Sequence, residues 1–120
     1  MVYVMNMKRR MNVKSIKKHI RVFPDFGSSG IWGYPGGGMI EYEDLGISLE
    51  LQKEFEDWIR FYDFECTAKK TFLVLKKKEK VLNRRGIELA TKLKKELPKK
   101  IIYYWPEWSK GKMAELQEIK

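Results

Sequence analysis

The segment ISLELQKEFEDWIRFYDF, residues 47–64, decides the fold because it carries the clearest helical pattern in the chain. Ser48 is a residue type that caps helix N-termini, and Glu50 follows in the first turn, where the helix dipole favours an acid. Apolar residues then recur on one stripe, at Leu51, Phe55, Trp58, Ile59 and Tyr62. A helix with one apolar face must bury that face against another layer.

A second helix is predicted from about Glu79 to Leu97, where Pro98 ends it. Its apolar stripe consists of Leu82, Gly86, Leu89, Ala90, Leu93 and Leu97. A glycine inside a helix costs about 1 kcal/mol relative to alanine. We therefore expect Gly86 to permit a close contact with the helix backbone. The preceding residues, Phe72–Leu75, fit either a short strand or the start of this helix.

Strands are predicted on both sides of this helical region. Residues 17–24 alternate apolar and polar positions before a proline, and residues 99–108 form a β-branched and aromatic run. Shorter extended pieces are expected at Ile31–Tyr34 and around Met39–Tyr42. Together they would form a hairpin-like segment that follows the first strand. Residues 111–120 are expected to form a frayed turn or helix.

This order of elements predicts an α+β fold with two layers, in which two helices cover a small antiparallel or mixed sheet. We expect one domain over residues 19–120, preceded by a basic N-terminal arm over residues 1–18. No run of 18 apolar residues exists, which excludes a transmembrane helix. The short apolar start precedes the basic residues, the reverse of a secretory signal, so a cytoplasmic location is expected.

The chain contains one cysteine, Cys66, and one histidine, His19, which excludes several kinds of chemistry. An intramolecular disulfide cannot form, and a Cys/His zinc site lacks ligands. A Ser-His-Asp or Cys-His nucleophile would depend on His19, whose neighbours Lys17, Lys18 and Arg21 disfavour a charged imidazolium. No calcium-loop signature accompanies the acidic residues. The sequence thus favours a protein that is not an enzyme and has no cofactor or metal.

The glycine-rich stretch FGSSGIWGYPGGGM, residues 26–39, resembles a phosphate-binding loop only in composition. It matches neither nucleotide-binding glycine pattern, contains no lysine or arginine, and opens no helix. Turn chemistry explains it better, because glycine accepts positive φ and Pro35 fixes its own φ. Trp32 is expected to anchor the loop on the core. Tyr34 is either a second packing residue or a contact for a partner.

Charge divides the chain into an acidic and a basic part, within a net charge of +9. Residues 25–65 hold ten acidic residues against Lys53 and Arg60, a net −8, and residues 66–104 hold thirteen basic residues against three acids, a net +10. The acidic block suggests a surface for a positively charged partner. Its candidate residues are Asp25, Tyr34, Glu41, Glu43 and Asp44. The alternative is a nucleic-acid-binding module that uses residues 69–100, with candidates Lys77, Lys78, Arg84 and Arg85.

Four segments together resemble a group of small bacterial proteins. They are IRVFPDFGSSGIW, EDLGISLELQKEFEDWIRFYD, GIELATKLKKEL and YYWPEW, within residues 19–108. The group comprises immunity proteins of polymorphic or contact-dependent inhibition toxin systems. The residues most typical of it are Asp25, Gly27, Ser28 and Trp32.

The resemblance implies an α+β protein without enzymatic activity that binds and neutralises a cognate bacterial toxin domain. Residues 1–18 lie outside the matching pattern. A local acidic surface, such as that of residues 25–65, could mimic nucleic acid and cover the basic site of a toxin nuclease. A genetic neighbour encoding a large toxin would be the partner to test.

Overall fold

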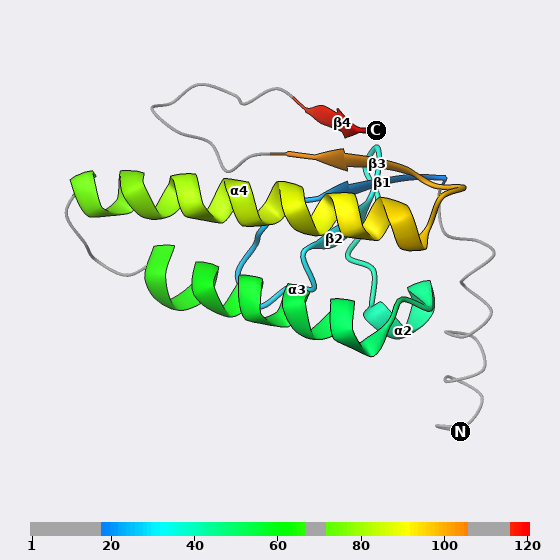
Figure 1. The fold of residues 1–120 in the computed structure, drawn as a ribbon, viewed down its shortest axis with the longest axis horizontal. Helices are drawn as coiled ribbons and strands as arrows, with labels where there is room; N and C mark the ends of the chain where they lie inside the picture. Colours follow the sequence, from blue (N-terminus) through cyan, green and yellow to red (C-terminus); the bar gives the residue numbers. More distant parts are fainter. Residues whose placement is uncertain (1–17, 67–71, 106–115) are drawn as a thin grey trace.

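The computed structural model describes residues 18–66, 72–105 and 116–120. In these ranges a sheet forms one layer and the helices cover one of its faces (Figure 1). The boundary between the predicted arm, residues 1–18, and the predicted domain, residues 19–120, stays a prediction, because residues 1–17 lie outside the described ranges.

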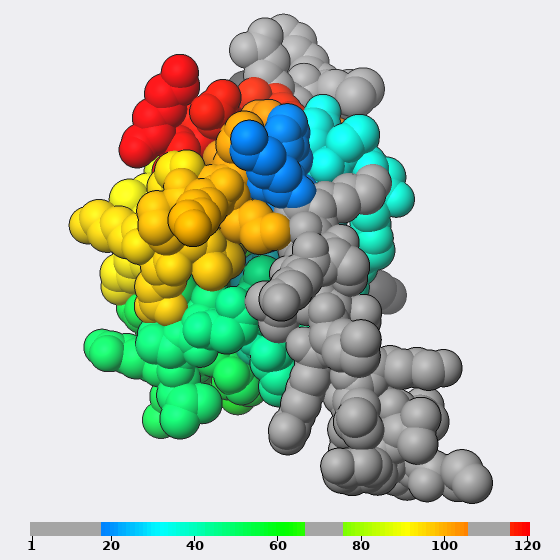
Figure 2. All heavy atoms as spheres, turned by 90° about the vertical axis from the view of Figure 1, so that its right-hand side faces the viewer, coloured from blue at the N-terminus to red at the C-terminus, as the bar shows by residue number. Residues whose placement is uncertain are grey.

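The sheet contains strands β1 (His19–Val22), β2 (Ile31–Gly33), β3 (Ile101–Tyr104) and β4 (Gln117–Ile119), in the order β2-β1-β3-β4. β1 pairs parallel with β3, whereas β1–β2 and β3–β4 are antiparallel. In the end-on view of Figure 2, red, orange, blue and cyan segments follow one another along the top, above the yellow and green helices. The predicted two-layer α+β fold is therefore confirmed, and its sheet is mixed.

The helical layer contains α2 (Tyr42–Leu45), α3 (Leu49–Phe61), a π-helical turn η1 (Tyr62–Cys66) and α4 (Phe72–Glu96). α4 already begins at Phe72, which settles the ambiguity at Phe72–Leu75 in favour of a helix. A short apolar run cannot distinguish the two, and here the long helical segment that follows extends back through it. None of the helices in the described ranges is both long and apolar enough to cross a bilayer.

The core lies between the sheet and the two long helices. Alternate strand residues are buried, and the apolar stripes of both helices meet them. The fully buried large side chains are Trp58, Tyr104, Phe55, Ile20, Ile31, Leu51, Leu82, Leu93, Ile102 and Val22. The stripe predicted on α3 is confirmed at Leu51, Phe55, Trp58 and Ile59, which are all buried.

The extended piece expected at Met39–Tyr42 is only partly present. Met39 forms a single antiparallel bridge with Trp32, and α2 then begins at Tyr42. The Tyr42 hydroxyl donates a hydrogen bond of 2.7 Å to the Ser29 carbonyl, which ties the start of α2 to the glycine-rich loop. Gly46 ends α2 in the left-handed conformation, at φ 68°.

The expected frayed turn or helix at residues 111–120 is wrong where it can be checked. Gln117–Ile119 form strand β4, and Ile119 pairs with Ile102 of β3. Ile119 is buried, whereas Gln117 and Glu118 are exposed. A strand with one buried residue has too short an alternation to be recognised from sequence, so pairing with β3 decides its structure. Residues 111–115 lie outside the described ranges.

Ser48 caps α3 as predicted, and the structure adds a contact to the end of α4. Its hydroxyl accepts a hydrogen bond of 3.1 Å from the Leu51 N–H and donates one of 2.7 Å to Glu96. The other Glu96 carboxylate oxygen accepts from the Ser48 N–H, also at 2.7 Å. This cap therefore joins the beginning of α3 to the last turn of α4.

We expect Ser48→Ala to lower the free energy of unfolding by about 1 kcal/mol, the usual cost of losing a helix cap. Glu96→Gln should cost less, because its amide can still accept one of the two hydrogen bonds from residue 48. Urea titrations of both variants would measure the difference. An unchanged midpoint for Ser48→Ala would show that the cap contributes nothing to stability.

Candidate functional site

The serines of the glycine-rich loop are bound to the loop's own backbone. The Ser28 hydroxyl donates to the Asp25 carbonyl at 2.8 Å and accepts from the Gly30 N–H at 3.1 Å. The Ser29 hydroxyl is buried and donates to the Ile40 carbonyl at 2.7 Å. These bonds give the serines a structural role and support the turn-chemistry interpretation of the loop.

Gly30 fixes the position of this loop against α3. Its φ is +82°, and a Cβ placed there would lie 3.0 Å from Cζ3 of Trp58 and 3.2 Å from Cδ1 of Ile59. Glycine alone combines this backbone conformation with such a close approach. The loop is therefore packed directly on the Trp58 indole.

The expectation that Trp32 packs on the core is wrong, because its side chain lies on the face of the sheet that the helices do not cover. Its indole N–H donates to the Phe23 carbonyl at 3.0 Å. Its ring lies 5.8 Å from the Arg21 guanidinium, which also lies 4.9 Å from the ring of Trp105. Because side chains alternate along a strand, Trp32 points away from its buried neighbour Ile31.

Three of the predicted partner residues lie near the loop and α2. Asp25 and Glu43 are exposed, and Glu41 is half-buried. Asp25 also accepts a hydrogen bond of 2.8 Å from the Phe26 N–H, so it shapes the turn at the loop tip.

The other two predicted partner residues are not brought to that surface. Tyr34 lies beyond β2, with its ring centroid 5.1 Å from that of Tyr103, and its N–H donates to the His19 carbonyl at 3.0 Å. Asp44 is buried in α2, with 9% of its surface exposed, which leaves little of it for a partner.

A hollow of about 400 Å³ opens between the glycine-rich loop and the second half of α3. We call it the loop–helix hollow. It is lined by Gly27, Ser28, Ser29, Met39, Glu41, Tyr42, Glu56, Ile59, Arg60, Asp63 and Phe64. The hollow thus joins the loop, the start of α2, α3 and η1 in one concave surface.

Acidic groups dominate this hollow. Glu41, Glu56 and Asp63 line it together with one cation, Arg60, whose guanidinium forms an ion pair of 3.1 Å with Asp57. Burial, and then the nearby carboxylates of Glu56 and Glu41, raise the pKa of Tyr42 well above its usual value. Burial and these two carboxylates thus both disfavour ionisation of the Tyr42 phenol.

Sequence reasoning found Glu41 but missed the other acids of the hollow. The spacing of Glu56, Arg60 and Asp63 places them on one polar stripe of the helical segment, and this signal could have identified them. Their meeting with Gly27 could not be read from the chain, because 36 residues separate Gly27 from Asp63.

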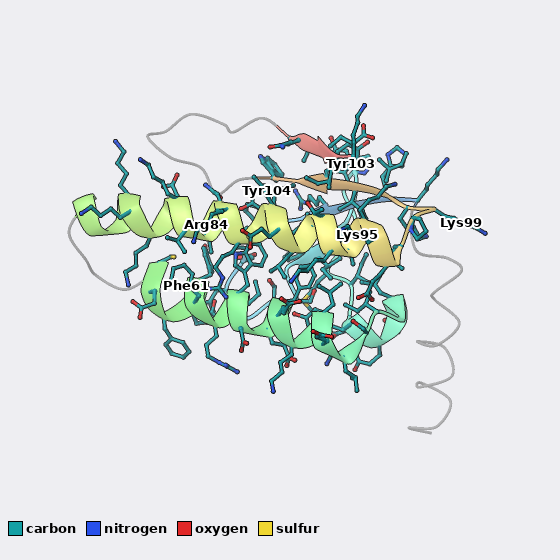
Figure 3. The ribbon with its side chains drawn as sticks, viewed as in Figure 1. Phe61, Arg84, Lys95, Lys99, Tyr103 and Tyr104 are labelled. Carbon is teal, nitrogen blue, oxygen red and sulfur yellow. The ribbon has the colours of Figure 1, made fainter. Side chains whose placement is uncertain are left out.

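The four basic candidates of α4 divide into two pairs. Lys78 forms an ion pair of 2.5 Å with Glu65, and both Lys78 and Arg85 lie over the Phe61 ring, at 6.0 and 5.1 Å. Figure 3 places Phe61 between α3 and α4, close to the end of α3. Lys77 and Arg84 are exposed instead. A nucleic-acid surface built from all four stays a prediction, and two of them already have partners within the protein.

Few side chains suited to metal binding or nucleophilic catalysis occur together in the part of the chain that the structure describes. No cluster of three His, Cys, Asp or Glu residues there has the arrangement to hold a metal ion. His19 lies in β1, with its Nδ1 3.4 Å from the Tyr103 hydroxyl, and Cys66 lies half-buried in η1. The histidine and the cysteine therefore stand on different elements, β1 and η1.

Comparison with known proteins identifies the family. A family model described as Serratia CdiI immunity protein-like matches residues 18–107, three quarters of the chain. A search of curated proteins returned no match. The matched range includes β1, the glycine-rich loop, the loop–helix hollow, both long helices and β3. The chain therefore belongs to the Serratia CdiI immunity protein-like family.

Proposed function

We propose that this protein binds and neutralises the toxin domain of its own contact-dependent inhibition system. The observation that carries the proposal is the family match over residues 18–107, because immunity to a toxin requires a toxin partner. The protein acts by binding the toxin in a stoichiometric complex, and it does not turn over a substrate. The complex forms in the cytoplasm of the producing cell.

The absence of an enzymatic role is supported by what the reactive residues do in the fold. Ser28 and Ser29 hold the loop through their hydroxyl groups. The ring of His19 packs against the Tyr103 ring, with the two centroids 5.8 Å apart. A binding role needs only a surface of the right shape and charge.

The surface that we assign to the toxin is the acidic side of the loop, α2 and α3. It includes Asp25, Glu41 and Glu43 from the original candidates, together with the loop–helix hollow. A concentrated acidic surface attracts a basic partner and raises the association rate. A toxin that cleaves nucleic acid has such a basic site.

We expect the double charge reversal Glu41→Lys with Glu43→Lys to weaken binding of the neighbouring toxin domain by about tenfold or more at low salt. Most of the loss should appear as slower association, and it should shrink as salt screens the charges. Surface plasmon resonance at several salt concentrations would measure both rates, with thermal melts to confirm folding.

The matched control reverses the same amount of charge elsewhere, at Glu88 on α4 and Glu118 on β4, which are both exposed. This control should bind like the parent protein. Equal affinity of the parent and the Glu41/Glu43 variant would place the binding surface on another face. A parent protein that neither binds nor protects cells from the toxin would refute the proposed function itself.

A further inference from the structure

Large hydrophobic side chains are exposed to water around the loop–helix hollow. Phe64 and Met39 line it with 70% and 43% of their surfaces exposed, and Phe26, next to the lining residue Gly27, is 71% exposed. Leu49 is the fourth large hydrophobic residue of the described ranges with such exposure, and it lies at the other end of α3. We call Phe26, Met39 and Phe64 the apolar rim.

The core does not account for the two phenylalanines of this rim. Phe64 belongs to η1, none of whose residues is buried. Phe26 lies in a turn that the Ser28 N–H closes by donating to the Asp25 carbonyl at 3.1 Å, a position where glycine and polar residues predominate. Exposed aromatic side chains that gather at one concavity are typical of a surface that a partner covers.

The backbone segments that bear the two phenylalanines are tied to the rest of the protein. The Gly27 N–H lies 3.3 Å from each carboxylate oxygen of Asp63, which joins the loop tip to η1. Glu65 forms an ion pair of 2.5 Å with Lys78, which joins η1 to α4. A partner can therefore cover the exposed rings without first ordering the backbone beneath them, which lowers the cost of binding.

The charge around the apolar rim indicates the chemistry of that partner. The hollow is lined by three acidic residues and one basic residue, Glu41, Glu56, Asp63 and Arg60. Asp25, which precedes Phe26, is exposed as well. An apolar contact surrounded by acidic residues complements an apolar side chain surrounded by basic residues. This complementarity is one of net charge and needs no unpaired carboxylate.

We propose that the apolar rim is the centre of the toxin interface, where the toxin domain buries an apolar side chain against Phe26, Met39 and Phe64. Basic residues of the toxin flank that side chain and face the acidic groups around the hollow. Aromatic residues at the centre of an interface contribute much of its binding energy, whereas charges at its edge mainly speed association. This inference rests on the proposed function and specifies the contact that provides its affinity.

The test titrates purified variants with the toxin domain encoded beside this gene, by surface plasmon resonance at low and high salt. Phe64→Ala is expected to weaken binding about 30-fold, the effect of losing an aromatic residue at the centre of a contact. Most of the loss should appear as faster dissociation, and it should persist at high salt, because salt screens charges and not apolar contacts. The Glu41/Glu43 reversal has the opposite signature, a slower association that salt diminishes.

Two further substitutions of Phe64 test whether the contact is apolar. Phe64→Leu keeps an apolar side chain and should retain most of the affinity, whereas Phe64→Gln should bind as weakly as Phe64→Ala. Leu49→Ala is the matched control, because it removes an exposed apolar side chain elsewhere on the surface, and it should bind like the parent. All four variants should melt with the parent protein, since surface substitutions seldom change stability much.

An alanine scan of the exposed large hydrophobic residues of the toxin domain then identifies the buried side chain. Its replacement should weaken binding strongly, and Phe64→Ala should then cost little more, because the two residues share one contact. If every such replacement added fully to the effect of Phe64→Ala, no apolar side chain of the toxin would meet the rim, and the inference would be overturned.

The outcomes separate this inference from the proposed function. If the parent protein does not bind the toxin domain, the proposed function fails. If the parent binds and Phe64→Ala binds equally well, the function stands and the apolar rim is not the contact. The same conclusion follows if Phe64→Gln binds as tightly as Phe64→Leu, or if sedimentation shows a dimer of the parent that Phe64→Ala dissociates while toxin binding is unchanged. In that last case a second copy of the chain covers the rim.

Discussion

Replacing Trp58 by alanine is expected to lower the free energy of unfolding by about 3–5 kcal/mol, the usual cost of removing a large aromatic side chain from a core. Trp58 is fully buried, with ring centroids of Phe55 and Tyr104 at 6.2 and 6.4 Å. Its indole N–H also donates to the Leu82 carbonyl at 2.9 Å, a bond that joins α3 to α4. The variant therefore loses packing and a buried hydrogen bond together.

Urea unfolding followed by circular dichroism measures this loss, as a lower midpoint with an unchanged slope. Leu49→Ala is the control, because Leu49 belongs to the same helix but is 81% exposed. Its effect should stay within about 0.5 kcal/mol. If Trp58→Ala unfolded at the same urea concentration as the parent, α3 could not face the sheet as described.

The sequence was most informative about the helices, because a long periodic pattern has one structural explanation. The stripe of α3 and the cap at Ser48 could be predicted with their residue numbers. Both features are local, since they depend on the spacing and type of residues within one segment. The same holds for β1, whose alternation between buried Ile20 and Val22 and their neighbours is regular.

Features that depend on distant segments could not be predicted. β4 exists because Ile119 pairs with Ile102, and α2 is held in place by the hydrogen bond of Tyr42 to Ser29. The loop–helix hollow requires Gly27 and Asp63 to meet, and nothing in either segment indicates the other. The candidate site is therefore the part that sequence reasoning reached least, finding only Glu41 among its acidic lining residues.

The contact at Gly86 could be predicted only in part, because its existence was indicated by local sequence but its partners come from distant segments. A glycine inside the apolar stripe of a predicted helix indicated a close contact, and the structure confirms this expectation. The partners of that contact are the rings of Tyr104 from β3 and Trp58 from α3, which no local pattern could name. The Tyr104 hydroxyl also donates to the Asn83 side chain at 2.7 Å, so the ring lies directly along α4.

We expect Gly86→Ala to destabilise the protein by about 1–3 kcal/mol, the typical cost of overpacking a core. Helix propensity alone predicts the opposite sign, since alanine favours a helix by about 1 kcal/mol over glycine. A Cβ at residue 86 would lie 2.3 Å from Cε1 of Tyr104 and 2.7 Å from Cζ2 of Trp58. Both rings are fully buried, and protein cores are closely packed, so we expect the packing cost to exceed the propensity gain.

Thr91→Ala measures the contribution of helix propensity without the packing cost, because Thr91 lies on the exposed side of the same helix. It should leave stability equal or slightly raised, as propensity predicts. In a Tyr104→Leu background, whose own stability will be lower, the added cost of Gly86→Ala should fall well below its cost in the parent, since the nearest ring atoms are gone. A Gly86→Ala protein more stable than the parent would contradict the close approach of α4 to β3, and with it the packing that positions α3 and the hollow beneath the loop.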